Sequence, residues 1–127
     1  VIQAARVKKE QVAKIIIGGP MMGKAVYSYD IPVTKTTSAI ICMTEKESYM
    51  APESVCIRCR KCVDVCPERL VPQILAEYAE RYEWDLFRRA GGMNCCECGS
   101  CTYVCPARRS LTQIFAGAKN VVKSREA

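Results

Sequence analysis

The chain of 127 residues is half hydrophobic and a quarter charged, a balance typical of one ordinary globular domain or two small ones. It contains no run of eighteen apolar residues, which predicts no membrane span, and its charged N-terminal residues do not resemble a signal peptide. The formal net charge is +6, with ten cysteines and no histidine, so a metal site would have to use cysteine or carboxylate ligands.

The first fifty residues predict short strands. Apolar runs rich in β-branched residues occur at three places, 13–19, 30–37 and 38–43. The segment GGPMMGKA lacks the glycine spacing of a dinucleotide-binding loop or a P-loop, and we interpret it as a structural turn with Met21 and Met22 packed on a core. Because such a short segment folds marginally alone and the chain begins with Val1 rather than Met, we expect residues 1–50 to be the tail of a larger β-containing domain whose upstream part is missing.

Residues 51–127 predict a second, mainly helical domain. Pro72 suits the first turn of a helix, and apolar side chains follow it at helical spacing, namely Ile74, Leu75, Tyr78 and Tyr82. A second helical segment, 84–90, is predicted to end at Gly91-Gly92. The last predicted helix carries an apolar stripe formed by Leu111, Ile114, Phe115, Ala118, Val121 and Val122. We expect these stripes to form the core, and we assign none of them to a cofactor.

Two segments of this second half align without a gap, CIRCRKCVDVCP at 56–67 and CCECGSCTYVCP at 95–106. Both have the spacing C-x2-C-x2-C-x3-C-P, which is the ligand run of bacterial four-iron ferredoxins. In that run three cysteines hold one 4Fe-4S cluster, and the fourth binds the other cluster. The sequence therefore predicts two 4Fe-4S clusters with crossed ligands. The first is assigned to Cys56, Cys59, Cys62 and Cys105, and the second to Cys95, Cys98, Cys101 and Cys66.

Two cysteines lie outside this register. If Cys96 replaced Cys95 as a ligand, the second copy would no longer have the spacing of the first copy. We therefore interpret Cys96 as a thiol beside the ligands or in the packing. Cys42, within an apolar run, receives the same interpretation. The alternative to clusters is a pair of zinc sites with four cysteines each. Zinc ribbons use paired C-x2-C knuckles and require neither the third cysteine nor the repeated proline, so the pattern favours clusters.

The complete ligand sets favour electron transfer over catalysis. Neither copy lacks a ligand, so no iron is left open for a substrate, and we predict no catalytic residue. An oxidised four-iron cluster with its four thiolates carries about −2, so two clusters would lower the net charge to about +2. We therefore expect the basic excess to offset cluster charge, and we expect no nucleic-acid partner.

The two motifs differ in charge. Arg58, Arg60 and Lys61 lie inside the first, where the second has Glu97, Gly99 and Ser100. Because cations favour the more negative reduced state, we hypothesise that the first cluster has the higher reduction potential. The basic pairs Arg88-Arg89 and Arg108-Arg109 could dock an acidic partner, although exposed basic pairs usually have no function.

Several segments resemble a known family in the same order along the chain. IGGPMMG at 17–23, IPVTKTTSAII at 31–41, the first cysteine motif followed by LVPQ at 70–73, and ECGSCTYVCP at 97–106 resemble the C-terminal part of the C subunit of the Rnf electron-transport complex. The spacer 67–94, with two helical patterns and no strand hairpin, resembles the α-helical ferredoxin domains of respiratory iron–sulfur subunits. The expected fold is thus α+β, with a small β-containing N-terminal segment (1–50) followed by an α-helical ferredoxin domain (51–127) that holds the two clusters.

The resemblance also implies a biological setting. It implies an electron-relay subunit, peripheral on the cytoplasmic side of the cell membrane, in an NADH/ferredoxin oxidoreductase complex that translocates sodium ions or protons. Its expected partners are other subunits of that complex and redox proteins such as ferredoxin. FMN and NADH would bind only in the missing upstream region, so this chain is not expected to oxidise NADH itself. The alternative is the related corrin reductase of bacterial diol-utilisation compartments. The LVPQ continuation favours the Rnf family.

Overall fold

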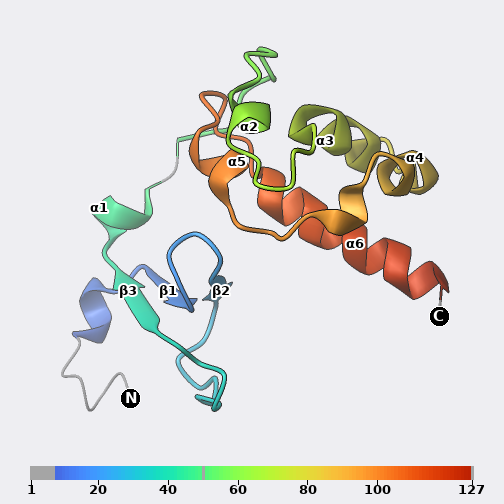
Figure 1. Cartoon of the computed structure of the whole chain (residues 1–127). Helices are drawn as coiled ribbons and strands as arrows, with labels where there is room; N and C mark the ends of the chain where they lie inside the picture. The colour runs from blue at the N-terminus through green and yellow to red at the C-terminus, as the bar shows by residue number, and fades with distance from the viewer. Residues whose placement is uncertain (1–7, 50, 127) are drawn as a thin grey trace. The chain divides into compact units, whose positions relative to one another are not determined.

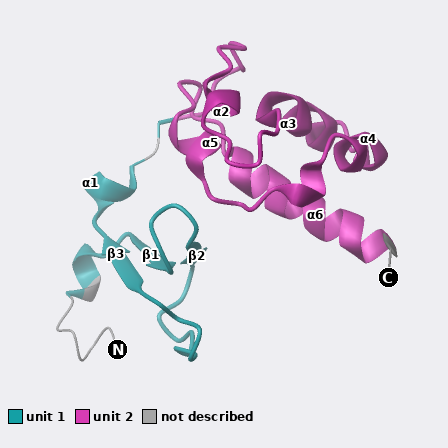
Figure 2. Ribbon diagram, in the orientation of Figure 1, with its two compact units in different colours: residues 1–51 teal, residues 52–127 magenta. Residues whose placement is uncertain are grey.

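The structure, a computed structural model, describes residues 8–49 and 51–126. Its contacts divide the chain into two compact units, residues 1–51 and 52–127 (Figure 2). The first contains a small antiparallel sheet, and the second contains helices and loops (Figure 1). The α+β class predicted from the sequence is confirmed.

The sheet of the first unit has the strand order β2-β1-β3, with β1 at Lys14–Ile17, β2 at Lys24–Val26 and β3 at Ile40–Met43. Ile16 of the central strand lies opposite Ala25 and Ile41. The short 3-10 helix η1 (Lys9–Gln11) precedes β1, and the one-turn helix α1 (Glu45–Ser48) follows β3. Two of the predicted apolar runs, 13–19 and 38–43, therefore contain β1 and β3.

Two expectations for this unit are wrong. Residues 30–37 form turns instead of a strand, because Pro32 has no amide hydrogen for a ladder and the threonine side chains bond within the segment. There the Thr34 amide donates to Thr37 Oγ1 over 3.2 Å, and the Thr37 amide donates to Thr34 O over 3.0 Å. Met21 and Met22 are 44% and 63% exposed, so they do not fill a core. The turn is compact for another reason. A Cβ at Gly23 would lie 2.4 Å from Gly19 O, which only glycine avoids.

The second unit consists of α2 (Lys61–Asp64), α3 (Pro72–Glu80), α4 (Trp84–Arg89), the 3-10 turn η2 (Gly92–Asn94), α5 (Ser100–Tyr103) and α6 (Leu111–Glu126). The predicted helices after Pro72 and at 84–90 are confirmed, and α4 is followed by Gly91 at φ 82°. One assigned residue is wrong: Tyr82 lies beyond the end of α3, at φ 59° and 75% exposed.

Helices α3, α4 and α6 surround the core of the second unit (Figure 1). Leu75, Phe87 and Phe115 are almost fully buried, and the ring centroids of the two phenylalanines lie 6.3 Å apart. Gly92 allows this packing, since a Cβ there would lie 2.4 Å from the Phe87 ring. The two cysteine motifs lie on loops and short helices beside this core, so the core determines where their side chains are held.

Candidate iron–sulfur centres

The two cysteine motifs share one backbone conformation. Equivalent residues adopt the left-handed region in both copies: Arg58 (φ 54°) and Glu97 (φ 55°), Arg60 (φ 65°) and Gly99 (φ 84°), Arg69 (φ 52°) and Arg108 (φ 55°). One-turn helices follow at equivalent places, α2 in the first copy and α5 in the second. The sequence repeat is thus also a structural repeat, which turns the chain around successive cysteines in the same way.

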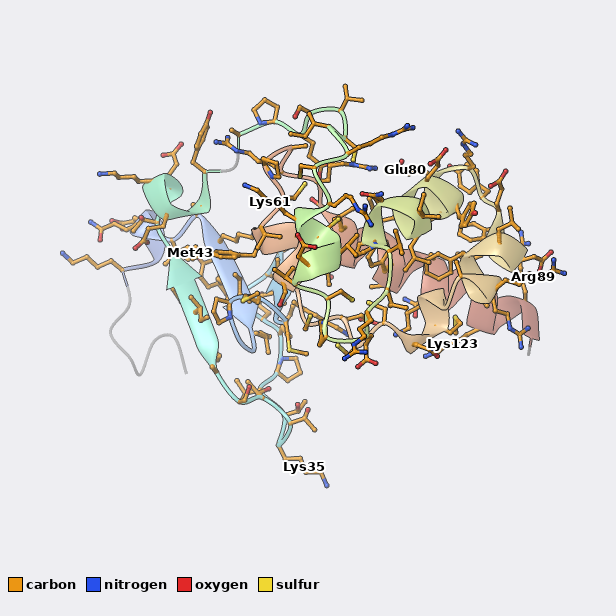
Figure 3. The ribbon with its side chains drawn as sticks, turned by 45° about the horizontal axis from the view of Figure 1, so that its top comes forward. Lys35, Met43, Lys61, Glu80, Arg89 and Lys123 are labelled. Carbon is orange, nitrogen blue, oxygen red and sulfur yellow. The ribbon has the colours of Figure 1, made fainter. Side chains whose placement is uncertain are left out.

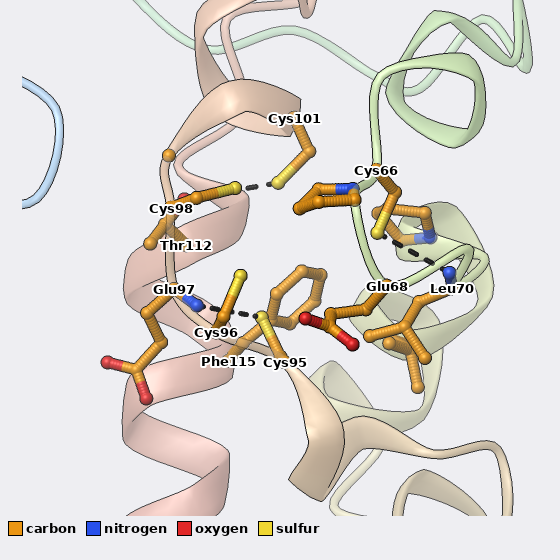
Figure 4. Close-up of a pocket in the computed structure, with 14 residues that line it drawn as sticks. Cys66, Glu68, Leu70, Cys95, Cys96, Glu97, Cys98, Cys101, Thr112 and Phe115 are labelled. Carbon is orange, nitrogen blue, oxygen red and sulfur yellow. Dashed lines mark hydrogen bonds between the residues drawn. The ribbon is translucent and has the colours of Figure 1, made fainter.

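Backbone amides point at the sulfur atoms. The Arg58 amide donates to Cys56 Sγ, and the equivalent Glu97 amide donates to Cys95 Sγ, each over 3.4 Å. The Leu70 amide donates to Cys66 Sγ, also over 3.4 Å (Figure 4). Donors of this kind favour negatively charged sulfur, which is the form that ligates metals.

The cysteines gather around two separate cavities. Cys56, Cys59 and Cys62 of the first motif line one cavity together with Cys105 of the second, and we call this the first centre. Cys95, Cys98 and Cys101 line the other cavity together with Cys66 of the first motif, and we call this the second centre (Figure 4). The short helices α2 and α5, which pack against each other, account for the exchange, because Cys62 and Cys101 lie within them and Cys66 and Cys105 follow them. The structure thus brings the eight cysteines together in the groups that the sequence predicts, while their role as ligands stays a prediction.

The two remaining cysteines lie in different places. Cys42 is in β3, opposite Ile15 of β1, and belongs to the first unit. Cys96 lines the cavity of the second centre, which agrees with the interpretation of Cys96 as a thiol beside the predicted ligands (Figure 4).

The second centre is enclosed by apolar side chains. Leu70, Pro72, Leu75 and Phe115 line its cavity, and Cys101 is 8% exposed. At the first centre, Leu111 lines the cavity and Cys62 is 9% exposed. Such surroundings exclude water, and solvent exposure is one of the factors that set the potential of an iron–sulfur cluster.

Burial and hydrogen bonding act on the thiols in opposite directions. Burial raises the pKa of Cys62, Cys95 and Cys101. Hydrogen bonding to Ser100 lowers the pKa of Cys98. Because thiolates are the ligating form, metal binding must remove the protons of the buried thiols. Within residues 8–49 and 51–126, no three Cys, Asp or Glu side chains converge closely enough to hold a single metal ion. The donor set, four sulfurs spread around each of two cavities, fits a cluster at each centre.

Each centre has a nearly buried cation that sequence reasoning did not identify as part of the site. Arg109, 13% exposed, forms an ion pair with Glu80 and interacts with the Cys56 thiol. Arg109 is thus not an exposed cation, whereas Arg108 is exposed, and docking of an acidic partner stays a prediction. Lys119, also 13% exposed, contacts Cys95 and Glu97 at the second centre. Its sequence signal was weak: it follows the core residue Phe115 by four positions, about one helical turn.

Arg60 is expected to destabilise the first motif, because it has a Cβ in the left-handed conformation that Gly99 adopts in the second. That conformation costs such a residue roughly 1–2 kcal/mol, partly offset by the larger entropy of glycine in the unfolded chain. We expect Arg60→Gly to raise the free energy of unfolding by about 0.5–1 kcal/mol, measured by urea denaturation. Gly99→Ala is the matched control and should lower it. A loss of stability in Arg60→Gly would contradict the prediction.

Comparison with known proteins agrees with the cysteine pattern. Residues 55–110 match the family model described as a 4Fe-4S dicluster domain. The chain is 48% identical to the C subunit of the Na(+)-translocating ferredoxin:NAD(+) oxidoreductase complex of Acetobacterium woodii. The match includes 86% of this chain and 25% of that subunit. Over 94% of its length the chain is 42% identical to the C subunit of the ion-translocating oxidoreductase complex of Methanosarcina acetivorans, of which it covers 27%, and 32% identical to that of Buchnera aphidicola, of which it covers 25%.

The chain thus spans about a quarter of the length of these relatives. None of the helices in the described part of the chain has the length and hydropathy of a membrane span. The match extends over both units, since it includes most of the first as well as the cysteine motifs. The resemblance noted in the sequence is confirmed: over most of its length the chain is similar to part of the C subunits of the Rnf-type ion-translocating oxidoreductase complexes.

Proposed function

We propose that this chain transfers electrons through two 4Fe-4S clusters, the first held by Cys56, Cys59, Cys62 and Cys105 and the second by Cys95, Cys98, Cys101 and Cys66. The observation that carries the proposal is the arrangement of these cysteines, three from one motif and the fourth from the other, around each of two cavities. A 4Fe-4S cluster bound there would accept and release single electrons.

The chain's own residues have three tasks in this function. The amides of Arg58, Glu97 and Leu70 donate to cysteine sulfur and so stabilise negative charge. Apolar side chains such as Phe115 and Leu111 exclude water from the cavities. Helices α2 and α5 hold the two centres close together, because each separates a cysteine of one centre from a cysteine of the other by only three residues. Close centres are what electron transfer between them needs.

The relatives suggest where this transfer takes place. We propose that the chain is part of a peripheral subunit on the cytoplasmic side of a membrane-associated NADH/ferredoxin oxidoreductase, and that it relays electrons between other components of that complex. FMN and NADH would then bind outside this segment. All three relatives are named as subunits of translocating oxidoreductase complexes, which supports this setting.

Iron and acid-labile sulfide content of anaerobically prepared protein tests the proposal. We expect about eight iron and eight sulfide per chain and a visible absorption band that bleaches with dithionite. Protein that contains zinc and still shows no visible band after anaerobic iron and sulfide reconstitution would instead be a zinc-stabilised binding module. That result would overturn the proposal.

A further inference from the structure

Lys119 is held in an unusual environment for a lysine. It lies on α6 and its side chain is 13% exposed, whereas lysine is seldom buried unless paired. Its Nζ donates to the Cys95 carbonyl oxygen over 2.8 Å and to Glu97 Oε1 over 2.7 Å. The Glu97 carboxylate, 40% exposed, is the more solvated member of the pair.

This pair lies directly against the second centre. Cys95 is both the residue whose carbonyl Lys119 contacts and a cysteine that lines the cavity. Glu97 belongs to the same loop, and its amide donates to Cys95 Sγ over 3.4 Å (Figure 4). A charge with so little exposure is weakly screened, so its effect on a neighbouring centre is larger than that of a solvated surface lysine.

The first motif does not offer the same pair, because the residue equivalent to Glu97 is Arg58. Arg58, Arg60 and Lys61 are all exposed, so solvent weakens the effect of the charges on which the potential order was predicted. The cation enclosed at the first centre is Arg109, paired with Glu80 of α3. Each centre thus has its own enclosed cation. At the second centre this cation, Lys119, pairs with a residue of the cysteine loop, whereas at the first centre Arg109 pairs with a residue of α3.

We propose that Lys119 and Glu97 act in opposite directions on the reduction potential of the second centre, with Lys119 raising it and Glu97 lowering it, so that the pair does more than attach α6 to the cysteine loop. The inference rests on the proposed function. Reduction adds one negative charge to the centre, which the Lys119 cation favours and the Glu97 carboxylate opposes.

Two substitutions test this, because both remove the Lys119–Glu97 ion pair but change the charge beside the second centre in opposite directions. Lys119→Met should lower one of the two midpoint potentials, and Glu97→Gln should raise the same one. In each case we expect the ratio of reduced to oxidised centre at a fixed applied potential to change at least about threefold, which is about 30 mV for one electron. Lys119→Arg keeps the charge and should stay close to the wild type. Lys123→Met is the matched control, because Lys123 is exposed on the same helix (Figure 3).

Redox titrations of the intact loaded chain, with iron and sulfide measured on every variant, give a clear decision. Opposite shifts of one potential support the inference. Unchanged potentials, or equal shifts of the same sign in both variants, would show a purely structural ion pair and overturn it. If Lys119→Met fails to assemble its clusters, the sign of the Glu97→Gln shift decides. Wild-type protein without iron and sulfide would instead remove the proposed function, and this inference with it.

Discussion

Replacing Cys66 with alanine is expected to remove the cluster of the second centre, although Cys66 belongs to the first motif. Cys66 lines the cavity of Cys95, Cys98 and Cys101. A variant that lacks one of four thiolate ligands should lose that cluster, so the iron content should fall from about eight to about four per chain. Cys96→Ala is the matched control. It removes a thiol that lines the same cavity but is not an assigned ligand, and it should retain about eight iron.

Double variants distinguish crossed from uncrossed ligands. If Cys66 and Cys95 serve the same cluster, Cys66→Ala with Cys95→Ala should still contain about four iron, since both changes affect one centre. Cys66→Ala with Cys56→Ala should then contain almost none. The reverse pattern would show that each motif holds its own cluster and would contradict the assignment. Loss of iron in Cys96→Ala would show that Cys96 is a ligand.

Phe115→Ala is expected to destabilise the second unit by about 3–5 kcal/mol, the range for truncating a buried phenylalanine. Phe115 is 1% exposed, lies near Phe87 in the core and lines the cavity of the second centre. This loss is a large part of the total free energy of unfolding, which is only about 5–15 kcal/mol for a whole domain. The cavity left behind should also admit water to the second centre.

Anaerobic urea denaturation of the loaded protein, followed by far-ultraviolet circular dichroism, measures this loss. Tyr103→Ala is the matched control because Tyr103 is an aromatic residue within the second motif that is 79% exposed. Its replacement should change the unfolding free energy by no more than about 0.5 kcal/mol. Equal effects of the two substitutions would show that Phe115 packing does not stabilise this unit.

Local features were predictable from the sequence because they depend on residues close together in the chain. The helix that begins at Pro72 and the end of α4 shortly before Gly91 follow from backbone preferences that act within one turn. The prediction of a strand at 30–37 was wrong for a related reason. β-branched composition favours a strand. Composition alone does not show that Pro32 lacks an amide hydrogen for pairing or that the threonine side chains bond to the backbone instead.

The sequence by itself determined the cysteine repeat, the candidate ligands and the family resemblance. The spacing of successive cysteines is set by the local chain, and residues 55–110 match a 4Fe-4S dicluster domain. Only the tertiary structure decided which charged and aromatic groups surround each centre. Lys119 is 24 residues from Cys95, and Arg109 is 29 residues from Glu80. These contacts form because core packing brings α6 and the segment before it against the cysteine loops and α3. Sequence periodicity does not predict such contacts. The residues expected to change the reduction potentials of the centres could therefore be identified only from the packed fold.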